Sequence, residues 1–296
     1  MSSIYFLARS GNTLARWTPQ SARHALGASI GAASYFGWLS KRFVTRLNMA
    51  QITGRPAHDP YVKRLALASW RNYGRYASDF ISFPHLDVDN VVRNLRDLSE
   101  CEGGWLGCVQ SALQAGRGAL LVTAHFGNWD TAGAILAHHH PVSAVAETFN
   151  DEQLNQLLQN QRREKGIGII PMEGSARPIL RLLQQNQVAA IVVDRPMAED
   201  QGTEVMFFGR KTYVPSGPAA LALKSGAAIV PGFVWYGHRN EFYARMFPPI
   251  FPQESKGEER VREISRLTQR MYDALEVMIR EWPTQWYMFR QFWPSE

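Results

Sequence analysis

Residues Ala119 to Asp130 read ALLVTAHFGNWD, in which the short apolar run Ala119 to Ala124 ends abruptly in polar and turn-forming residues. An apolar run of this length, bounded by such residues, is typical of a strand buried on both faces of a sheet. The following stretch, Thr131 to His138, has a helical pattern. The strand, the turn and the helix together predict the first unit of an α/β fold.

The same alternation continues toward the C-terminus. Strand-like runs follow at Val142 to Ala146, Ile167 to Ile170, Val188 to Val193, Glu204 to Phe208, Ala227 to Trp235 and Glu241 to Phe247. Helical stretches occur at Asp151 to Lys165, from Gly174 through Gln185, at Ser216 to Lys224 and at about Lys256 to Glu281. Short β-rich runs that alternate with helices of about 10–15 residues indicate βαβ units around a mixed, mostly parallel central sheet.

The length of 296 residues fits one large domain or two small ones, and no linker-like tract divides the chain. Residues 1–115 have mostly helical patterns, whereas residues 116–296 carry the alternation. We therefore expect one continuous α/β domain, made of an N-terminal helical, membrane-facing layer over 1–115 and a sheet core flanked by helices over 116–296.

The positive charge is concentrated near the N-terminus. Residues 1–75 contain eleven Lys or Arg and a single acid, Asp59, although the net charge of the whole chain is only +6. A basic segment on a near-neutral body indicates a polyanionic surface as partner, either nucleic acid or anionic lipid.

The stretch Ala25 to Ser40 favours lipid over nucleic acid. It is 16 residues without a charge, rich in small residues, and it ends in Tyr35, Phe36 and Trp38. A membrane span needs about 20 apolar residues, and a secretory signal would be expected to end at a small-residue cleavage site. We predict an interfacial helix that lies on an anionic bilayer, with no nucleic-acid partner. The alternative is a buried helix with solvated basic neighbours.

The block after the first strand contains the best candidate for chemistry, His125. It stands at the strand's carboxyl end, where open α/β sheets build their sites. Asp130 follows five residues later, a separation of about 140° on an ideal helix, so a turn through Gly127 and Asn128 would have to bring the two together. A carboxylate bonded to one imidazole nitrogen fixes the tautomer and leaves the other nitrogen as a general base.

A second acid competes for this role. Asp194, followed by Arg195, comes directly after the apolar run Val188 to Val193. If the sheet is parallel, Asp194 lies on the same rim as His125. Both Asp130 and Asp194 therefore stay open as the partner of His125.

Other reactive groups lack the surroundings that catalysis or metal binding needs. No Ser or Cys stands in a G-x-S-x-G context, so attack by a substrate hydroxyl is favoured over a covalent acyl-enzyme. Cys101 and Cys108 have no companion ligands, so we expect two free thiols on a helix. The run from His138 to His140 ends a helix and is not expected to bind metal. No Walker loop, dinucleotide-binding glycine motif or EF-hand occurs, so no cofactor is expected.

Several blocks in the same order carry a resemblance to a known family. The chain resembles the late acyltransferases of bacterial glycolipid synthesis, which are lysophospholipid acyltransferase-like: the lipid A lauroyl and myristoyl acyltransferases and, more closely, the phosphatidylinositol mannoside acyltransferases. The shared blocks are H-x4-D (His125 to Asp130), acid-Arg (Asp194, Arg195), FFG (Phe207 to Gly209), P-x-G (Pro215, Gly217), G-A-x-I-V-P (Gly226 to Pro231) and P-x-Q-W with a following Arg (Pro283, Gln285, Trp286, Arg290).

The resemblance implies transfer of a fatty acyl group from acyl-CoA or acyl carrier protein to a glycolipid hydroxyl at the cytoplasmic face of the membrane, by a peripheral enzyme without cofactor. It assigns the catalytic His to His125, with Asp130 or Asp194 as partner. It also implies an Arg on the helix before the third strand, at Arg162 or Arg163. We expect substrate contacts from Asn128, Arg163, Arg195, Phe208, Gly209, Pro215 and Gly217.

Two alternatives share these blocks or the same groove. One is a lysophospholipid acyltransferase, and the other is a thioesterase or a non-catalytic lipid-binding protein. The chain differs from the lipid A enzymes in having no clear N-terminal transmembrane helix and in its Gly-Asn-Trp insert, which disfavours lipid A as acceptor.

Overall fold

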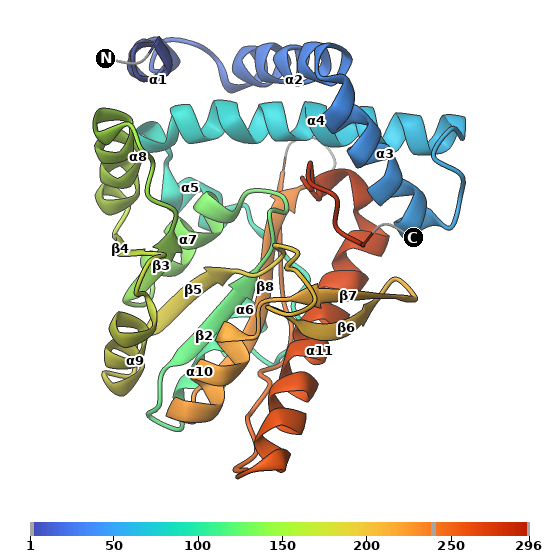
Figure 1. The fold of residues 1–296 in the computed structure, drawn as a ribbon. Helices are drawn as coiled ribbons and strands as arrows, with labels where there is room; N and C mark the ends of the chain where they lie inside the picture. The colour runs from blue at the N-terminus through green and yellow to red at the C-terminus, as the bar shows by residue number, and fades with distance from the viewer. Residues whose placement is uncertain (1–2, 238–240, 295–296) are drawn as a thin grey trace.

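The computed structural model describes residues 3–237 and 241–294. Its main sheet has seven strands in the order β1-β9-β8-β2-β5-β3-β4 (Figure 1). The strands are β1 (Arg96–Asp97), β2 (Ala119–Thr123), β3 (Val142–Ala146), β4 (Ile167–Pro171), β5 (Val188–Val192), β8 (Ala228–Tyr236) and β9 (Phe242–Met246). Strands β8, β2, β5, β3 and β4 are parallel, whereas β9 runs antiparallel to β8 and pairs in parallel with β1. The predicted mixed, mostly parallel α/β fold is confirmed.

Strand β2 lies at the centre of the sheet, and both of its faces are buried. Leu120 and Val122 point into the core shared with α9 (Ala176–Gln184), α10 (Gly217–Ser225) and α11 (Glu258–Glu281). Ala119 and Leu121 belong to the core on the opposite face, with α6 (Gly104–Leu113) and α7 (Trp129–Ala137). The period of two along a strand explains why the run had to be apolar throughout.

Strands β6 (Thr203–Phe207) and β7 (Arg210–Val214) form a separate two-stranded antiparallel sheet, which the sequence did not predict. Their connection is the two-residue turn Phe208-Gly209, in which both residues have positive φ, 52° and 70°. That geometry is typical of a type I′ hairpin turn. The predicted strand Glu204 to Phe208 therefore ends one residue early, because Phe208 turns the chain back.

The N-terminal helices form a layer across one end of the sheet (Figure 1). They are α1 (Ser3–Ala15), α2 (Gln20–Gly37), α3 (Leu39–Thr53) and α4 (Pro60–Ile81). A Cβ added at Gly27 would lie 2.3 Å from the Gly74 carbonyl oxygen, and one at Gly31 would lie 2.1 Å from that of Trp70. The small residues of α2 therefore let its backbone touch α4.

The remaining helices pack nearer the sheet. They are α5 (Val88–Arg93), α8 (Glu152–Glu164) and the short 3-10 segments η1 (Phe83–His85) and η3 (Pro283–Gln285). Strand β1 and helix α6 lie within residues 1–115 but pack in the sheet and against β2, β8 and β9. Among the described residues, no helix combines the length and the apolar character needed to cross a bilayer.

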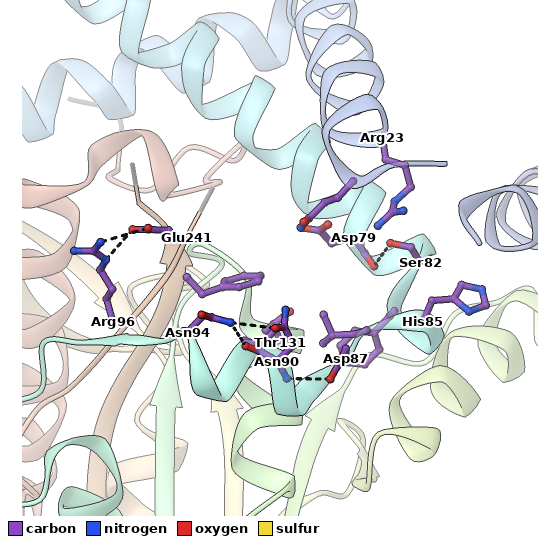
Figure 2. Close-up of a pocket in the computed structure, with 15 residues that line it drawn as sticks. Arg23, Asp79, Ser82, His85, Asp87, Asn90, Asn94, Arg96, Thr131 and Glu241 are labelled. Carbon is purple, nitrogen blue, oxygen red and sulfur yellow. Dashed lines mark hydrogen bonds and ion pairs between the residues drawn. The ribbon is translucent and has the colours of Figure 1, made fainter. Parts of the chain in front are cut away.

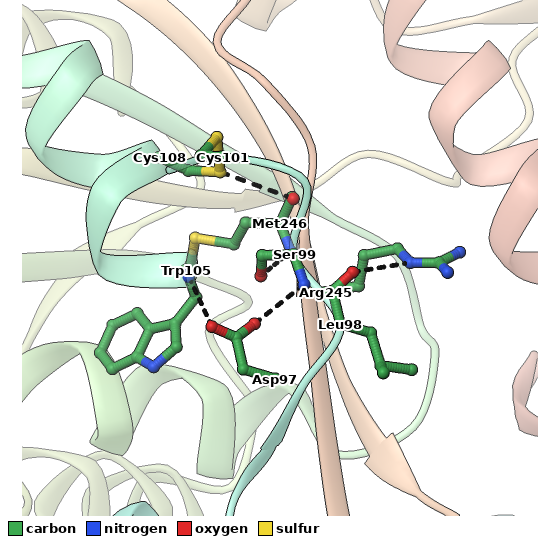
Figure 3. The surroundings of a disulfide bond; sticks show 8 residues. All are labelled: Asp97, Leu98, Ser99, Cys101, Trp105, Cys108, Arg245 and Met246. Carbon is green, nitrogen blue, oxygen red and sulfur yellow. Dashed lines mark hydrogen bonds between the residues drawn. A yellow bond between two sulfur atoms is a disulfide. The ribbon is translucent and has the colours of Figure 1, made fainter. Parts of the chain in front are cut away.

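The expectation of two free thiols was wrong, because Cys101 and Cys108 form a disulfide (Figure 3). Cys108 lies on α6, but Cys101 lies before the helix in a turn that also contains Gly103 and Gly104, both with positive φ. This turn folds the chain back, so that the two Cα atoms are 5.3 Å apart. A spacing of seven residues on one straight helix would have separated them by two turns.

Candidate active site

Strand register brings His125 and Asp194 together. In the parallel pair β2–β5, Thr123 is opposite Val192. His125 and Asp194 each stand two residues beyond this pair, at the carboxyl ends of adjacent central strands. The backbone bond from Val193 N to Thr123 O, 2.9 Å, continues the pairing past the strand ends. The predicted common rim is therefore present.

The two side chains form a close pair. His125 Nδ1 lies 2.7 Å from Asp194 Oδ1, and the backbone N–H of His125 lies 3.0 Å from each carboxylate oxygen. Since a carboxylate only accepts, Nδ1 carries the proton, and Nε2 has its lone pair available. The Asp194 side chain has no exposed surface, whereas 30% of the His125 side chain is exposed. A base with one oriented and one open nitrogen results.

Electrostatics keep Asp194 ionised despite its burial. Burial by itself raises the pKa of Asp194. The charge of His125, its side-chain and backbone hydrogen bonds, and the N–H of Trp286 act in the opposite direction and prevail, so the pKa lies below its ordinary value. The carboxylate is thus an anion that can stabilise a protonated imidazole.

The loop after β2 requires glycine at Gly127. Its φ is +59°, and a Cβ there would lie 2.2 Å from the Val234 carbonyl oxygen on β8. Asn128 N donates to that same carbonyl, at 2.8 Å, and the Asn128 side chain accepts from Thr131 N as the N-cap of α7. The loop therefore crosses tightly onto β8 before α7 begins.

Asp130, the other candidate partner of His125, contacts Arg162 and Tyr76 instead. Its Oδ1 accepts from Arg162 Nε at 2.7 Å, and its Oδ2 accepts from the Tyr76 hydroxyl at 2.7 Å. All three groups are largely buried. Among the described residues, no hydrogen bond or ion pair joins Asp130 to His125. Asp130 therefore ties α7 to α8 and α4.

Arg162 and Arg163, adjacent on α8, differ in their surroundings. Arg162 is held by Asp130, whereas Arg163 is exposed and donates to Asn160 on its own helix, 2.9 Å away. The structure does not bring Arg163, a predicted substrate contact, into the His125 pair.

Arg195, the residue after Asp194, forms an ion pair with Glu147. Arg195 Nη2 lies 2.7 Å from Glu147 Oε2 at the end of β3. The hydrogen bond from Arg195 lowers the pKa of Glu147, and the charges of Arg195, Arg290 and His125 contribute further. Glu147 follows β3, which is next to β5 in the sheet, and the sequence analysis assigned it no role. Arg290 was noted there only as the Arg that follows the P-x-Q-W block.

The other predicted substrate contacts lie on two neighbouring elements. Phe208 and Gly209 form the β6–β7 turn, with Phe208 N donating to Glu276 and Phe208 O accepting from Gln51. Pro215 and Gly217 lead from β7 into α10, whose last residue precedes β8. Because α10 runs back toward the amino end of β8, its first turn lies near the carboxyl rim.

A second buried network lies behind the loop. Asp79 on α4 accepts from His24 Nε2 at 2.7 Å, from the Tyr236 hydroxyl and from Asn128 Nδ2 at 3.2 Å. Asn128, predicted as a substrate contact, is itself 2% exposed and tied to this network. Helix patterns gave no signal for a His–Asp pair whose members are 55 residues apart.

A cavity of about 590 Å³ borders the same network (Figure 2). Its walls come from α2, α4, α5, α7 and β9 and include Arg23, Asp79, Asn90, Thr131 and Glu241. Several of these side chains are already paired with one another or with neighbours, such as Arg96 with Glu241. His125 does not line this cavity.

Aromatic rings enclose the inner side of His125. The Trp129 ring is 5.3 Å from the imidazole and 3.9 Å from the Tyr76 ring. Tyr287 contacts both Trp129 and Tyr73, and Tyr73 is partly exposed. An apolar wall beside a partly exposed imidazole suits contact with an apolar group.

Known proteins are similar to this chain over most of its length. The family described as bacterial lipid A biosynthesis acyltransferase matches residues 2–295. A phosphatidylinositol mannoside acyltransferase from Mycolicibacterium smegmatis (strain ATCC 700084 / mc(2)155) is 31% identical over 256 residues, 85% of this chain and 79% of that protein. The protein of the same name from Mycobacterium tuberculosis (strain ATCC 25618 / H37Rv) is 31% identical over 259 residues, 85% of this chain and 77% of that protein.

Proposed function

The chain belongs to the bacterial lipid A biosynthesis acyltransferase family and is an acyltransferase, and from this premise we propose that it transfers a fatty acyl chain from acyl-CoA or acyl carrier protein to a hydroxyl of a glycolipid. The observation that carries the proposal is the His125–Asp194 pair, in which Asp194 orients the imidazole through Nδ1 while 30% of the His125 side chain is exposed. The relatives' name favours an acceptor of the phosphatidylinositol mannoside type over one of the lipid A type.

In the proposed reaction His125 acts as the general base. Its Nε2 takes the proton of the acceptor hydroxyl while the hydroxyl oxygen attacks the thioester carbonyl. An ester C–O bond forms and the C–S bond breaks, and the proton on Nε2 passes to the leaving thiolate. Asp194 stabilises the imidazolium between these two transfers, as a buried carboxylate does in other His–carboxylate pairs.

The charged rim residues suit the developing and resident charges of the substrates. The tetrahedral intermediate bears an oxyanion, and both kinds of thioester donor carry phosphate groups. Arg195 follows Asp194 in the chain and pairs with Glu147, and the charge of Arg290 also lowers the pKa of Glu147. We propose that these two cations stabilise negative charge on the substrates, with Glu147 orienting Arg195.

The helical layer supports a peripheral place on the cytoplasmic face of the cell membrane. Apolar side chains with exposed fractions between 56% and 79% cluster in its helices and loops; they are Leu14, Trp17, Leu26, Ile30, Phe36, Trp38, Leu39 and Phe43. Cations stand beside the aromatic members, with Arg16 over Trp17 and Lys41 over Trp38. We name these eight side chains the apolar surface and propose that it enters an anionic bilayer.

The catalytic part is tested with labelled acyl-CoA or acyl carrier protein, with and without acceptor lipid. Label should appear in the acceptor with wild-type protein and fall about 10²–10⁴-fold with His125→Ala. Phosphatidylinositol mannoside, lipid A precursor and lysophospholipid are compared as acceptors. Release of free fatty acid at an acceptor-independent rate, or acylation of lysophospholipid alone, would replace this proposal by one of the two alternatives.

The membrane part is tested by vesicle co-sedimentation. Leu26→Ser with Ile30→Ser should weaken binding to anionic vesicles, whereas Val261→Ser, equally exposed on α11 at 66%, should not. Binding should weaken further as salt shortens the Debye length to about 8 Å at physiological ionic strength. Equal binding to neutral and anionic vesicles at low salt would remove the electrostatic part of the proposal.

A further inference from the structure

The segment from Pro283 to Tyr287 is hydrogen-bonded to the loop that carries His125. Gly127 N donates to Gln285 O at 2.9 Å, and Tyr287 N donates to His125 O at 2.8 Å. Phe126 and Trp286 pair between these two bonds as an isolated bridge. A piece of chain near the C-terminus thus fixes the backbone on both sides of Phe126.

The side chain of Trp286 also reaches the carboxylate of the pair. Its indole Nε1 donates to Asp194 Oδ2 at 2.9 Å, while Asp194 Oδ1 accepts from His125 Nδ1 at 2.7 Å. Trp286 and Asp194 both have 0% exposed surface. Water therefore does not compete for this bond, and a buried carboxylate oxygen depends on the donors that the protein supplies.

Packing leaves the indole little freedom to turn away. Its ring contacts Phe207, Phe292 and Trp293 at centroid distances between 5.4 and 6.2 Å. Its backbone carbonyl accepts from the Ser69 hydroxyl on α4 at 2.6 Å. The N–H direction is thus set by the surrounding core, as a preorganised donor requires.

We propose that Trp286 is a positioning residue of the reaction, whose indole N–H orients the Asp194 carboxylate and moderates its pull on the proton of His125. This inference rests on the proposed role of His125 as base. The backbone bonds of Gln285 and Tyr287 hold the loop, and the indole holds the carboxylate, so that one segment sets both halves of the pair.

Loss of the indole N–H should shift the pH dependence of activity in one direction. A hydrogen bond donated to a carboxylate draws negative charge toward the donor. Without the indole N–H, Asp194 attracts a protonated imidazole more strongly. The enzyme would then need a higher pH before His125 is free to act as base, so the acidic limb of the pH–rate profile should move upward.

Trp286→Phe tests the proposal, with Trp235→Phe as its matched control. Trp235 is equally buried and its ring contacts the same Phe126, but its Nε1 has no hydrogen-bond partner among the described residues. Trp286→Phe should lower kcat about tenfold with little change in KM, the factor expected for losing part of a hydrogen bond to a charged group. Its acidic limb should rise by roughly half a pH unit, whereas that of Trp235→Phe should stay in place.

A second measurement uses folded wild-type protein and does not depend on the tolerance of the core for phenylalanine. Among the nine tryptophan indole N–H resonances in NMR spectra, the resonance assigned to Trp286 should follow the protonation of His125 and lose that response in Asp194→Asn. The Trp129 resonance is assigned separately, because that ring lies 5.3 Å from the imidazole. Kinetics of Trp286→Phe equal to those of Trp235→Phe, or a Trp286 resonance that does not change with the protonation of His125, would overturn the positioning role. Full activity of His125→Ala would instead overturn the proposed function.

Discussion

Two of the His–Asp pairs among the described residues have the same contact distance and opposite surroundings. His125 Nδ1 and Asp194 Oδ1 are 2.7 Å apart, and so are His24 Nε2 and Asp79 Oδ1. In the first pair the imidazole is 30% exposed and the carboxylate is sealed. In the second pair the imidazole side chain is only 4% exposed. The same chemical contact thus occurs once at an open rim and once inside the helix packing.

The second ring nitrogen shows what each pair can do. Among the described residues, the Nδ1 atom of His24 is buried without a hydrogen-bond partner, and Asp79 also accepts hydrogen bonds from Tyr236 and Asn128. The His24 ring, only 4% exposed, therefore presents no open nitrogen. His125 has the reverse arrangement, since the carboxylate takes the inner nitrogen and leaves the outer one. Contact distance therefore does not distinguish the two pairs, whereas access to the second nitrogen does.

The largest expected difference between the pairs is in activity. His125→Ala should lower acyl transfer about 10²–10⁴-fold while the melting temperature stays close to that of wild type. His24→Ala should lower the free energy of unfolding by about 2–4 kcal/mol, because it leaves a cavity and takes a donor from a buried carboxylate. Its folded fraction should retain wild-type kcat within about threefold. Steady-state assays and urea titrations of both variants provide the measurements. A His24→Ala variant that is as stable as wild type but inactive would contradict the comparison.

A smaller effect separates the two acids that follow the strands. Asp194→Asn should lower kcat by about 10² or more, but should add almost nothing in a His125→Ala background, since groups that act as a unit lose their function once. Asp130→Asn should act through stability, because its contacts are Arg162 and Tyr76, and its effect should add to that of His125→Ala. Double-mutant cycles with His125→Ala test both expectations. Additive effects of Asp194→Asn and His125→Ala would show that these two residues do not act as a unit.

The sequence predicted the strand ends but not the order of the strands. The runs that became β2, β3 and β5 were located to within a residue, because apolar runs bounded by turn residues depend on local information. Whether Asp194 or Asp130 meets His125 depends on β5 lying next to β2 in the sheet. That adjacency is a long-range property, so both acids had to remain candidates.

Contacts between distant segments were even harder to predict from the sequence. Trp286 was known only as part of a P-x-Q-W block, and its bond to Asp194 spans 92 residues. The disulfide between Cys101 and Cys108 was not predicted, for a reason that is local in the sequence. Gly103 and Gly104, between the two cysteines, signal a turn that the assumption of a continuous helix ignored. The core of the site is thus set by pairings that a single sequence does not reveal.

The smallest expected effect is on how the stability of the protein depends on pH. Burial raises the pKa of Asp194, but the charge and hydrogen bonds of His125 and the bond from Trp286 bring it below the ordinary value. The folded protein therefore binds this proton more weakly than the unfolded chain, so the carboxylate's contribution to stability is complete above the unfolded pKa of about 3.9 and disappears as the pH falls through the lower folded pKa. Between pH 5 and pH 2.5, roughly the window of this transition, the urea midpoint of wild type should fall more steeply than that of Asp194→Asn. Parallel slopes across that window would show that the ionised carboxylate contributes nothing to folding, and would leave its retention in the interior to be explained by catalysis alone.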